Sequence, residues 1–389
     1  MQSDREPVPP PGEAKKTIRT FAFSSFFNDM GSDMIYPIWP LFVASLGANM
    51  AVLGLIDGIG NAIVSLSQAL SGYISDRTRK RKVFIWLGYL FGGISRLGYA
   101  LSATWHWLIP FRILDRAGKM RGAPRDAMVA DLSRRSNRGE NFGLIRTLDN
   151  AGALVGIVFC IAAFPLLGYR SLLLIAAVPS FIAVALIAIN IRERPLEDAK
   201  LFKGISFSHL DGNFRLFVVL SAVFSLGAFS YSFLLIFANK FGFEVTTVPI
   251  FYLLFTLVAT FCSYPFGVLS DRIGRKAVLQ ISYGLWGLVC LTMIYADSAW
   301  MVVAAFILFG LHQAGIDTVQ KAFVAELGPA EYRASALGGF QMVIGLCALP
   351  ASVGAGLLWD RFGMQAPFIA SLALTAISAA MLVFVKERP

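Results

Sequence analysis

The sequence predicts an all-α polytopic membrane protein with twelve transmembrane helices in two pseudo-symmetric six-helix bundles. Its 389 residues are 56% hydrophobic and only 15% charged, whereas soluble proteins carry about 25% charged residues. The apolar residues occur in runs of about 20, the length that crosses a hydrocarbon core of about 30 Å. Landmark residues of the first half recur 195 positions later in the second half. Composition, run length and internal repetition therefore support the same fold class.

The apolar runs give the order of the helices. We expect transmembrane helices at residues 17–45, 50–74, 83–102, 106–131, 141–166, 169–191, 214–238, 246–270, 277–296, 299–325, 334–358 and 366–385. Residues 1–16 are polar and proline-rich, so they are expected to form a disordered tail. The two bundles then span 17–191 and 214–389, and the polar stretch 192–213 is expected to link them in the cytoplasm.

The net charge of +10 is unevenly distributed over the loops. Nearly all Lys and Arg outside the helices fall in segments on one side of the membrane, while the opposite loops hold Arg170, Lys240 and Arg361. Cytoplasmic loops carry such an excess, so both termini are expected in the cytoplasm. Because topology explains the basic charge, we expect membrane lipid and no nucleic acid among the partners.

Other sequence signals exclude several classes of function. The cysteines, Cys160, Cys262, Cys290 and Cys347, lie inside apolar runs and predict no disulfide framework. No metal-ligand spacing and no phosphate-binding glycine loop occur, so we expect no metal, no cofactor and no enzyme activity. Nothing in the sequence predicts an obligate oligomer, so we expect a monomer.

The fourth expected helix, residues 106–131, carries an unusual number of charges. Arg112, Asp115, Arg116 and Lys119 are spaced i, i+3, i+4 and i+7, so they share one helix face. Charge at bilayer depth is unfavourable, and an intramembrane ionisable residue is a functional hypothesis by default. Arg121 points to the opposite side on an ideal helix, so we expect it to extend to the cytoplasmic interface.

Acidic residues on neighbouring helices complete the expected charged interior. In the first helix, Ser25, Asp29, Asp33 and Tyr36 share a face, and the fifth helix carries Arg146 and Asp149. These carboxylates either pair with arginines to hold the fold or form a proton or cation site. The expected central charged site is Asp29, Asp33, Arg112, Asp115, Arg116, Arg146 and Asp149.

Polar and aromatic side chains within the other helices predict a substrate cavity. The second half offers hydroxyl and aromatic groups rather than clustered charges. We therefore expect the first half to couple transport to protons and the second half to provide adaptable contacts to the substrate. The candidate cavity residues are Tyr36, Asp57, Asn61, Lys119, Tyr231, Tyr252, Thr256, Gln313, Asp317 and Gln341.

Equivalent residues recur in the two halves at a single offset. Asp76 and Asp271 stand in matching motifs, and the same offset aligns Asp131 with Glu326, Arg138 with Arg333 and Gly143 with Gly338. Two parallel halves of this kind are expected of transporters that rock around a central site.

The repeated motif resembles motif A of the major facilitator superfamily. The matching residues are Gly72, Asp76, Arg77 and Arg81 in the first half and Gly267, Asp271, Arg272, Gly274, Arg275 and Lys276 in the second, and Arg79 replaces the second glycine of the first copy. The resemblance implies a transporter in a bacterial cytoplasmic membrane. It also implies that Asp76 and Asp271 are gate residues, and a carboxylate at Asp76 is able to cap the N-terminus of the eleventh helix.

Two further motifs of that family are altered here. Arg112 stands where motif B has its arginine, followed by Asp115-Arg116 in place of Gln-Gly. The antiporter motif C has a Gly-Pro pair, whereas the fifth helix has Gly152 and Gly156, a small-residue packing face, and no proline before Pro165.

Three functions remain open on the sequence. The first is a secondary active, proton-coupled exporter of small organic compounds, in which Asp29 or Asp33 loses its proton when Arg112 or Arg116 approaches. The second is a proton-coupled importer of an organic anion or a metal chelate, favoured by the arginine-rich fourth helix and the altered motif C. The third is a membrane receptor or assembly factor that transports nothing.

Overall fold

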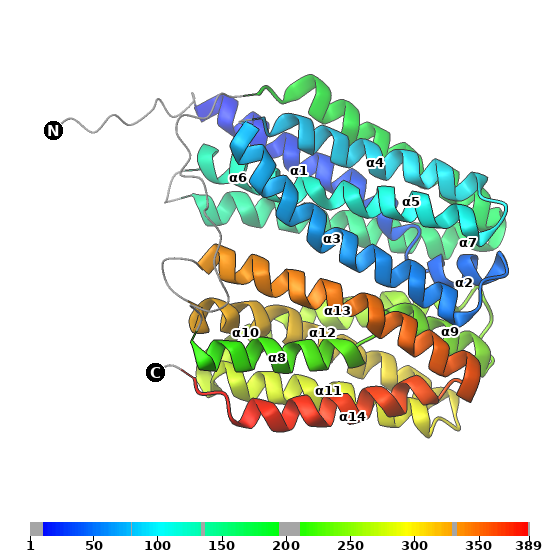
Figure 1. The fold of residues 1–389 in the computed structure, drawn as a ribbon. Coiled ribbons are helices and arrows are strands. Elements are labelled where there is room, and N and C mark those ends of the chain that lie inside the picture. The colour runs from blue at the N-terminus through cyan, green and yellow to red at the C-terminus, as the bar shows by residue number, and fades with distance from the viewer. Residues whose placement is uncertain (1–10, 79, 134–136, 194–210, 329–332, 388–389) are drawn as a thin grey trace. The chain divides into compact units, whose positions relative to one another are not determined.

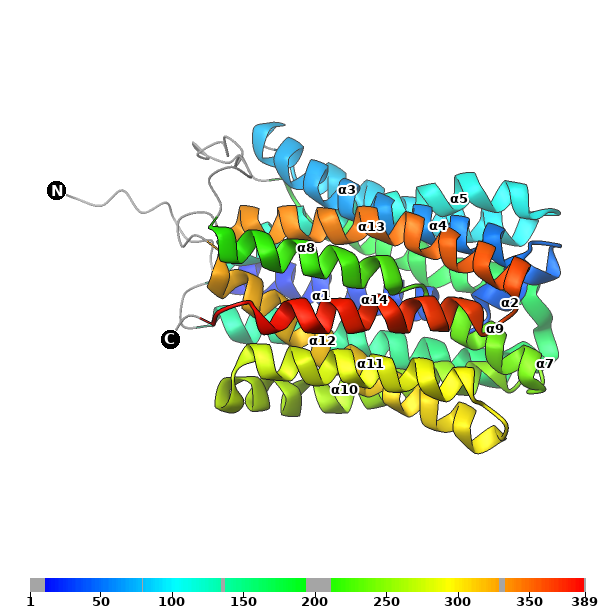
Figure 2. The same ribbon diagram turned by 60° about the horizontal axis from the view of Figure 1, so that its bottom comes forward.

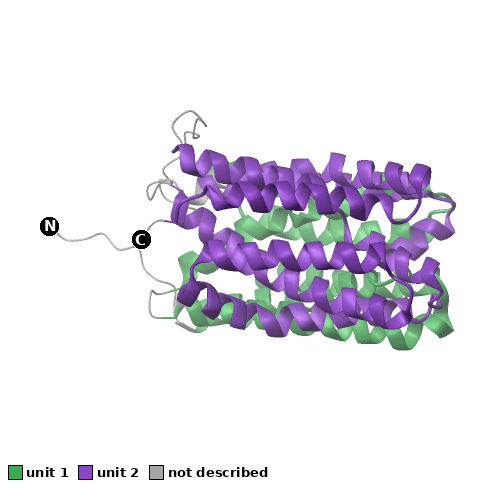
Figure 3. Cartoon of the chain, turned by 90° about the horizontal axis from the view of Figure 1, so that it is seen from below, with its two compact units in different colours: residues 1–38, 66–202 green, residues 39–65, 203–389 purple. Residues whose placement is uncertain are grey.

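The computed structural model describes residues 11–78, 80–133, 137–193, 211–328 and 333–387. The chain divides into two compact units: the first comprises residues 1–38 and 66–202, and the second comprises residues 39–65 and 203–389 (Figure 3). Each unit is described by itself below. These units differ from the predicted bundles 17–191 and 214–389 because residues 39–65 belong to the second unit. The division into two six-helix bundles stays a prediction.

The first unit is a bundle of long helices (Figure 1). Its elements are α1 (Pro11–Asp33), the latter part of α3 (Met50–Thr78), α4 (Lys82–Leu101), α5 (Trp105–Ala117), the 3₁₀ segment η1 (Gly118–Arg121), α6 (Gly122–Leu132) and α7 (Arg138–Asn190). The 53-residue α7 is two helices joined at Gly168, where φ is 66° and the backbone reverses. A turn falls between the expected fifth and sixth helices, as the sequence predicts.

The first helix differs from its expected extent at both ends. It begins at Pro11, inside the stretch expected to be disordered, with proline at the first helical position and Glu13 in the first turn, two features that favour a helix start. Residues 1–10 lie outside the described residues. The helix ends at Asp33, and turns precede the short helix α2 (Trp39–Ser45) because Pro37 has no N–H to continue the ladder.

Glycines bring α1 and α7 into close contact. A Cβ placed on Gly152 would lie 2.2 Å from the Phe26 carbonyl oxygen, and one on Gly156 would lie 2.2 Å from that of Met30. The small-residue packing face predicted for the fifth helix is confirmed. The adjoining core is apolar, with Phe21, Tyr89, Ile145 and Ile187 among its buried members.

The second unit contains α2, the first part of α3 and the remaining helices (Figure 2). These are α8 (Gly212–Gly227), α9 (Tyr231–Phe241), α10 (Val248–Ile273), α11 (Arg275–Ile294), α12 (Ala299–Leu327), α13 (Arg333–Phe362) and α14 (Ala366–Val383). Helix α12 packs against α10 and α11, and α14 packs against α8 and α11. His312 of α12 is buried and hydrogen-bonds the Ser282 carbonyl oxygen of α11 at 2.8 Å.

Each half interrupts its first crossing at an equivalent point. Helix α1 ends at Asp33 and α8 ends at Gly227, and each is followed by a short second helix. The break after α8 has a local cause, because the Ser230 hydroxyl caps α9 by accepting a hydrogen bond from the Ser232 N–H at 3.2 Å. The expected uninterrupted helices 17–45 and 214–238 are therefore wrong at these points. In contrast, α13 runs continuously through Pro350.

Residues 50–65 of α3 pack tightly on α13. A Cβ on Gly54 would lie 2.0 Å from the Ser352 carbonyl oxygen, and one on Gly356 would lie 2.2 Å from that of Met50. The Asp360 carboxylate accepts hydrogen bonds from the backbone N–H groups of Met50 and Ala51, at 3.1 and 2.9 Å. Backbone contact and a side-chain cap thus fix the start of α3 to the end of α13.

The helices suit a polytopic membrane protein. Among the described residues, nine helices are long and apolar enough to cross a membrane, and one of them, Gly139–Asn190, is long enough for two crossings. The charged segments α1 and α5–η1–α6 are not among these nine. The architecture is all-α and consistent with twelve crossings.

Candidate functional site

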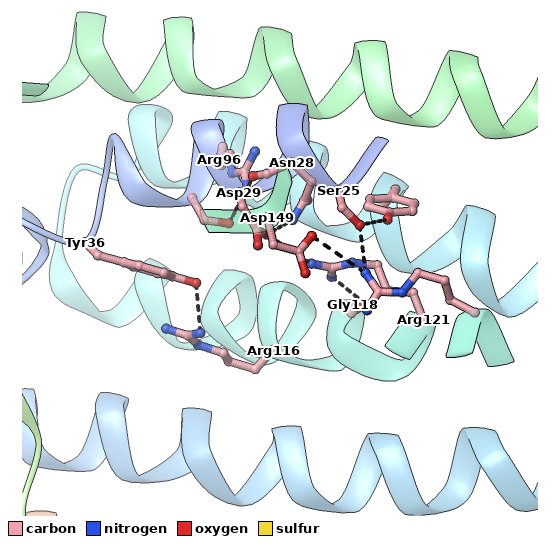
Figure 4. A network of polar contacts seen from close by, with 12 residues as sticks. Ser25, Asn28, Asp29, Tyr36, Arg96, Arg116, Gly118, Arg121 and Asp149 are labelled. Atoms are coloured by element: carbon pink, nitrogen blue, oxygen red, sulfur yellow. Dashed lines mark hydrogen bonds and ion pairs between the residues drawn. The ribbon is translucent and has the colours of Figure 1, made fainter. Parts of the chain in front are cut away.

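The first unit contains a cluster of acids and arginines contributed by α1, η1, α6 and α7 (Figure 4). The Asp29 carboxylate accepts a hydrogen bond from Asn28 Nδ2 at 2.9 Å, and Arg121 Nη2 lies 3.9 Å from Asp29 Oδ1. The Arg121 guanidinium also donates to the Gly118 carbonyl oxygen at 2.9 Å and lies over the Tyr89 ring, 4.8 Å from its centroid. Asp29 therefore has a cationic neighbour held in place by two other contacts.

The second acid of the cluster is Asp149 on α7. Arg125 Nη1 lies 3.9 Å from Asp149 Oδ1 and donates to Ser25 Oγ at 2.7 Å, while Arg125 Nε donates to Asp126 Oδ1 at 2.9 Å. The guanidinium thus stands between two carboxylates. Asp149 is buried, and it interacts electrostatically with Asp29 as a like charge. Two acids and two arginines form one coupled group.

The position of Arg121 corrects the sequence-based expectation. Its side chain is buried and turned toward Asp29, and it does not extend to an interface. The cause is η1, the 3₁₀ turn at Gly118–Arg121. A 3₁₀ turn advances about 120° per residue, compared with about 100° in an α-helix. The three steps from Gly118 to Arg121 therefore add roughly 60° of rotation, which turns Arg121 away from the outward direction expected on an ideal α-helix. Pro124 follows directly in α6.

The α5 charges form a second group around Tyr36. Arg116 Nη1 donates to the Tyr36 hydroxyl at 3.0 Å, with its guanidinium 5.1 Å from the ring centroid, and Arg116 Nε lies 3.6 Å from Asp115 Oδ2. Asp115 also interacts electrostatically with Arg112 and Lys119. Arg112 is buried and interacts electrostatically with Tyr99 of α4. The face predicted for the fourth helix is turned inward within its unit.

The other expected charged residues lie at the margins of these groups. Asp33 is half-buried at the end of α1, and its charge acts on Tyr36. Arg146 is exposed on α7, one turn from Asp149. Arg96 is buried but bonds no carboxylate among the described residues: it donates to the Asn28 and Ala176 carbonyl oxygens and to Ser32 Oγ. Arg96 therefore joins α1, α4 and α7.

Asp57 has polar partners within the second unit. Its carboxylate is buried and accepts hydrogen bonds from Trp39 Nε1 at 2.9 Å and Ser230 Oγ at 2.8 Å, as well as from Ser232 Oγ at 2.5 Å. These donors lie on α2 and at the start of α9. The sequence suggested Asp57 as a cavity residue, and the partners seen here are an indole and two hydroxyls.

The remaining cavity candidates are spread through the second unit. Tyr231 and Tyr252 contact each other edge to face, with ring centroids 5.3 Å apart, and Phe255 joins them. Thr256, Gln313 and Gln341 are half-buried, whereas Asn61 and Asp317 are exposed. Their shared role in a substrate cavity stays a prediction. Among the described residues, no group of three or more His, Cys, Asp or Glu side chains is arranged to hold a metal ion.

Motif A forms matched polar clusters in the two units. Arg81 pairs with Asp131 and Arg275 pairs with Glu326. In the first unit, Glu193 accepts hydrogen bonds from the N–H groups of Arg81 and Lys82 at 2.7 and 2.9 Å. In the second, Glu387 accepts one from the Lys276 N–H at 2.8 Å. The side chains of Lys82 and Lys276 donate to the Ala188 and Val383 carbonyl oxygens.

The motif glycines and aspartates are less uniform. Gly274 has a φ of 95°, and a Cβ there would lie 2.6 Å from Glu387 Oε2, so this turn requires glycine. Arg79, the counterpart of Gly274, lies outside the described residues, and so does the side chain of Asp76. The cap expected on the eleventh helix therefore stays a prediction. Asp271, Arg77 and Arg272 are exposed. A Cβ placed on Gly72 would lie 3.5 Å from Ala123, and one on Gly267 would lie 3.5 Å from Thr318, so the two positions are equivalent.

Sequence reasoning left Arg125, Asn28 and Tyr89 out of the site. Arg125 follows Arg121 by four residues, a spacing that places both on one helix face and is the signal that sequence reasoning missed. Asn28 and Tyr89 carry no such signal, because their roles depend on helix packing.

Comparison with known proteins gives a consistent family match. A family model described as Major Facilitator Superfamily matches residues 21–261 and 215–389. An uncharacterised MFS-type transporter of the archaeon Methanocaldococcus jannaschii is 37% identical over 383 residues, covering 96% of each chain. The multi-drug resistance efflux pump PmrA of Streptococcus pneumoniae is 22% identical over 383 residues, covering 94% of each chain.

Solved structures share the fold. The nucleoside transporter NupG superposes with a TM-score of 0.80 at 18% identity, covering 95% of this chain and 100% of that one. A bacterial homologue of the lysosomal transporter Spinster gives a TM-score of 0.77 at 14% identity, covering 98% and 97%.

Proposed function

Because the chain belongs to the major facilitator superfamily and is a multi-pass membrane protein, we propose that it exports a small organic solute by proton-coupled alternating access. The observation that carries this proposal is the cluster in which Arg121 lies beside Asp29, Arg125 lies beside Asp149, and the two acids interact with each other as like charges. Buried carboxylates and arginines in a transmembrane bundle are characteristic of proton relays and ion pathways. The similarity to PmrA supports export of organic compounds.

The geometry supports a specific step for proton transfer. The Arg125 guanidinium lies between Asp149 and Asp126. A proton on Asp149 cancels its charge, which weakens its attraction for Arg125 and leaves Asp126 as the stronger partner. At the same time Asp29 loses a like-charged neighbour and binds Arg121 more tightly. Protonation of one acid therefore redistributes contacts among α1, α6, η1 and α7.

A transport assay tests this proposal. Purified protein in proteoliposomes is given an imposed pH gradient, and a panel of lipophilic cations, neutral compounds and anions is screened for solute-dependent proton flux with an internal pH dye. For a compound that is transported, Asp149→Asn and Asp29→Asn should each abolish gradient-driven accumulation and spare exchange of solute for solute. Asp297→Asn, an exposed acid outside the cluster, is the matched control. Full gradient-driven accumulation in both cluster variants would refute the proposal.

A second candidate function follows from the charges around Tyr36. Arg112, Arg116 and Lys119 act on Asp115, and Asp33 is the second acid that acts on Tyr36, so three cations face two acids. This excess of positive charge favours an anionic solute, such as a carboxylate or a metal chelate, and supports the importer as the alternative. Competition between anionic and cationic dyes in the same proteoliposomes separates the two: preferential inhibition by anions, lost in Arg116→Gln, supports the importer.

A further inference from the structure

A basic and aromatic cavity lies in the first unit, and its lining includes no residue of the acid–arginine cluster or of the group around Tyr36. It has a volume of about 500 Å³ and is formed by the first turns of α1 and the last part of α7. The lining residues are Gly12, Lys15, Lys16, Arg19, Thr20, Phe23, Phe27 and Leu186. Three of these eight are cations and none is acidic. The cavity therefore suits an anion that also has an apolar part.

The order of the lining side chains along α1 is informative. Lys15, Arg19, Phe23 and Phe27 follow one another at four-residue intervals, so they form a single stripe on the helix. The two cations come first and the two aromatic rings follow. At 1.5 Å per residue the stripe is about 18 Å long, which compares with about 15 Å for one half of a hydrocarbon core.

The aromatic part of the stripe is open to the surroundings. The Phe23 side chain is 51% exposed, and Leu186 of α7 lines the same cavity. Cations that only set the orientation of the protein in the membrane need no cavity beside them and no neighbouring aromatic side chains. Charge at one end and apolar surface beyond it match the chemistry of a phospholipid: an anionic headgroup followed by acyl chain.

We propose that this cavity is a binding site for one anionic phospholipid of the leaflet on the Lys/Arg-rich side of the membrane. Lys15, Lys16 and Arg19 hold the phosphate, and Phe23, Phe27 and Leu186 pack against an acyl chain. The site is independent of the acid–arginine cluster, so it does not depend on the mechanism of transport. It fixes the start of α1, the helix that carries Asp29, to a component of the membrane.

Native mass spectrometry of the full-length protein in detergent tests the proposal. Dioleoyl phosphatidylglycerol and dioleoyl phosphatidylcholine are titrated separately, and the first lipid adduct is quantified. Each cation near a lipid surface contributes about fivefold in affinity, so phosphatidylglycerol should bind at least about tenfold more tightly than phosphatidylcholine. The triple variant Lys15→Gln, Lys16→Gln, Arg19→Gln should remove this preference. The matched triple Arg192→Gln, Arg215→Gln, Lys386→Gln changes three exposed cations outside the cavity and should keep it.

Two further probes distinguish a lipid from a free anion. Phe23→Ser should weaken dioleoyl phosphatidylglycerol and leave short-chain dihexanoyl phosphatidylglycerol unchanged. Inorganic phosphate should fail to displace the dioleoyl lipid at equal concentration. Equal binding of the two headgroups by the wild-type protein, an unaltered preference in the cavity triple variant, or displacement by inorganic phosphate would each overturn the proposal. Gel filtration and circular dichroism confirm that the variants are folded, which is expected because the substituted cations and Phe23 are exposed.

Discussion

Arg121 and Asp29 form an ion pair across the bundle of the first unit, with Nη2 and Oδ1 3.9 Å apart. Arg121 also contacts the Tyr89 ring and the Gly118 carbonyl oxygen. Removal of one member leaves the charge of the other uncompensated, and the Arg121 side chain is the more buried of the two. We therefore expect Arg121→Ala to lower the thermal stability of the purified protein more than Asp29→Ala does, because it also loses the ring contact.

A double-mutant cycle measures the pair itself. Residues in direct contact show interaction energies of about 0.5–3 kcal/mol, so the double variant should be less destabilised than the sum of the single ones. Arg170→Ala, an exposed arginine in the turn region of α7, is the control and should leave the stability near that of the wild type. Additive effects of the two substitutions would contradict the ion pair.

The sequence predicts the crossings well and their interruptions poorly. Run length and hydropathy place most helices, because the bilayer dimension dictates both. The break before α9 depends on the Ser230 cap, and the break after Asp33 depends on Pro37, both of which act within a few residues. A 20-residue hydrophobic run does not reveal such features, which explains why continuous helices were expected there.

The sequence reveals which charged residues lie within the helices, but it does not reveal which of them pair with each other. Asp29, Asp149 and Asp115 fall on the expected helices because charge inside an apolar run is conspicuous. Ideal α-helical phase placed Arg121 on the wrong side, since η1 intervenes. Likewise, no periodicity argument pairs Asp57 with serines more than 170 residues further along the chain.

Glu193 and Glu387 are expected to stabilise equivalent helix starts. Each carboxylate accepts backbone N–H groups at the beginning of α4 or α11, where the N–H groups of the first turn have no partner within the helix. Replacement of such a cap by alanine costs about 0.5–2 kcal/mol. Glu193→Ala should therefore speed amide hydrogen exchange in the first turn of α4, and Glu387→Ala should do so in α11.

The two substitutions provide controls for each other. Exchange at the start of α11 should be unchanged in Glu193→Ala, and exchange at the start of α4 should be unchanged in Glu387→Ala, because each cap acts within its own unit. Unaltered exchange at both helix starts in the double variant would show that these carboxylates do not act as caps.

Asp57 is expected to fix α2 and α9 to α3. One carboxylate oxygen accepts from Trp39 and the other from Ser230 and Ser232. Asparagine offers a single acceptor oxygen, so Asp57→Asn leaves at least one buried donor without its acceptor, at about 1–3 kcal/mol. We expect a lower melting temperature for Asp57→Asn and a smaller decrease for Ser232→Ala.

Ser180→Ala is the control for Ser232→Ala. It removes a buried hydroxyl that has no hydrogen-bond partner among the described residues, so the melting temperature should stay close to that of the wild type. An equal effect of the two serine substitutions would contradict the role of Asp57.

The contact between α1 and α7 gives the sharpest test of packing. A Cβ at Gly152 would lie 2.2 Å from the Phe26 carbonyl oxygen, so Gly152→Ala must move one helix away from the other. Overpacking of this kind costs about 1–3 kcal/mol. Gly143→Ala, on the same helix but with no atom within 4 Å of the added Cβ, should instead be neutral or stabilising, because alanine favours helix over glycine by about 1 kcal/mol. Thermal melts of the two variants in one detergent measure the difference in stability.

The same two variants also test the link between packing and transport. Helix α1 carries Asp29 and helix α7 carries Asp149, so Gly152→Ala should reduce gradient-driven transport, whereas Gly143→Ala should retain it. Opposite signs for the two glycines are the expected result, and a stable, fully active Gly152→Ala protein would show that α1 and α7 do not approach as closely as described.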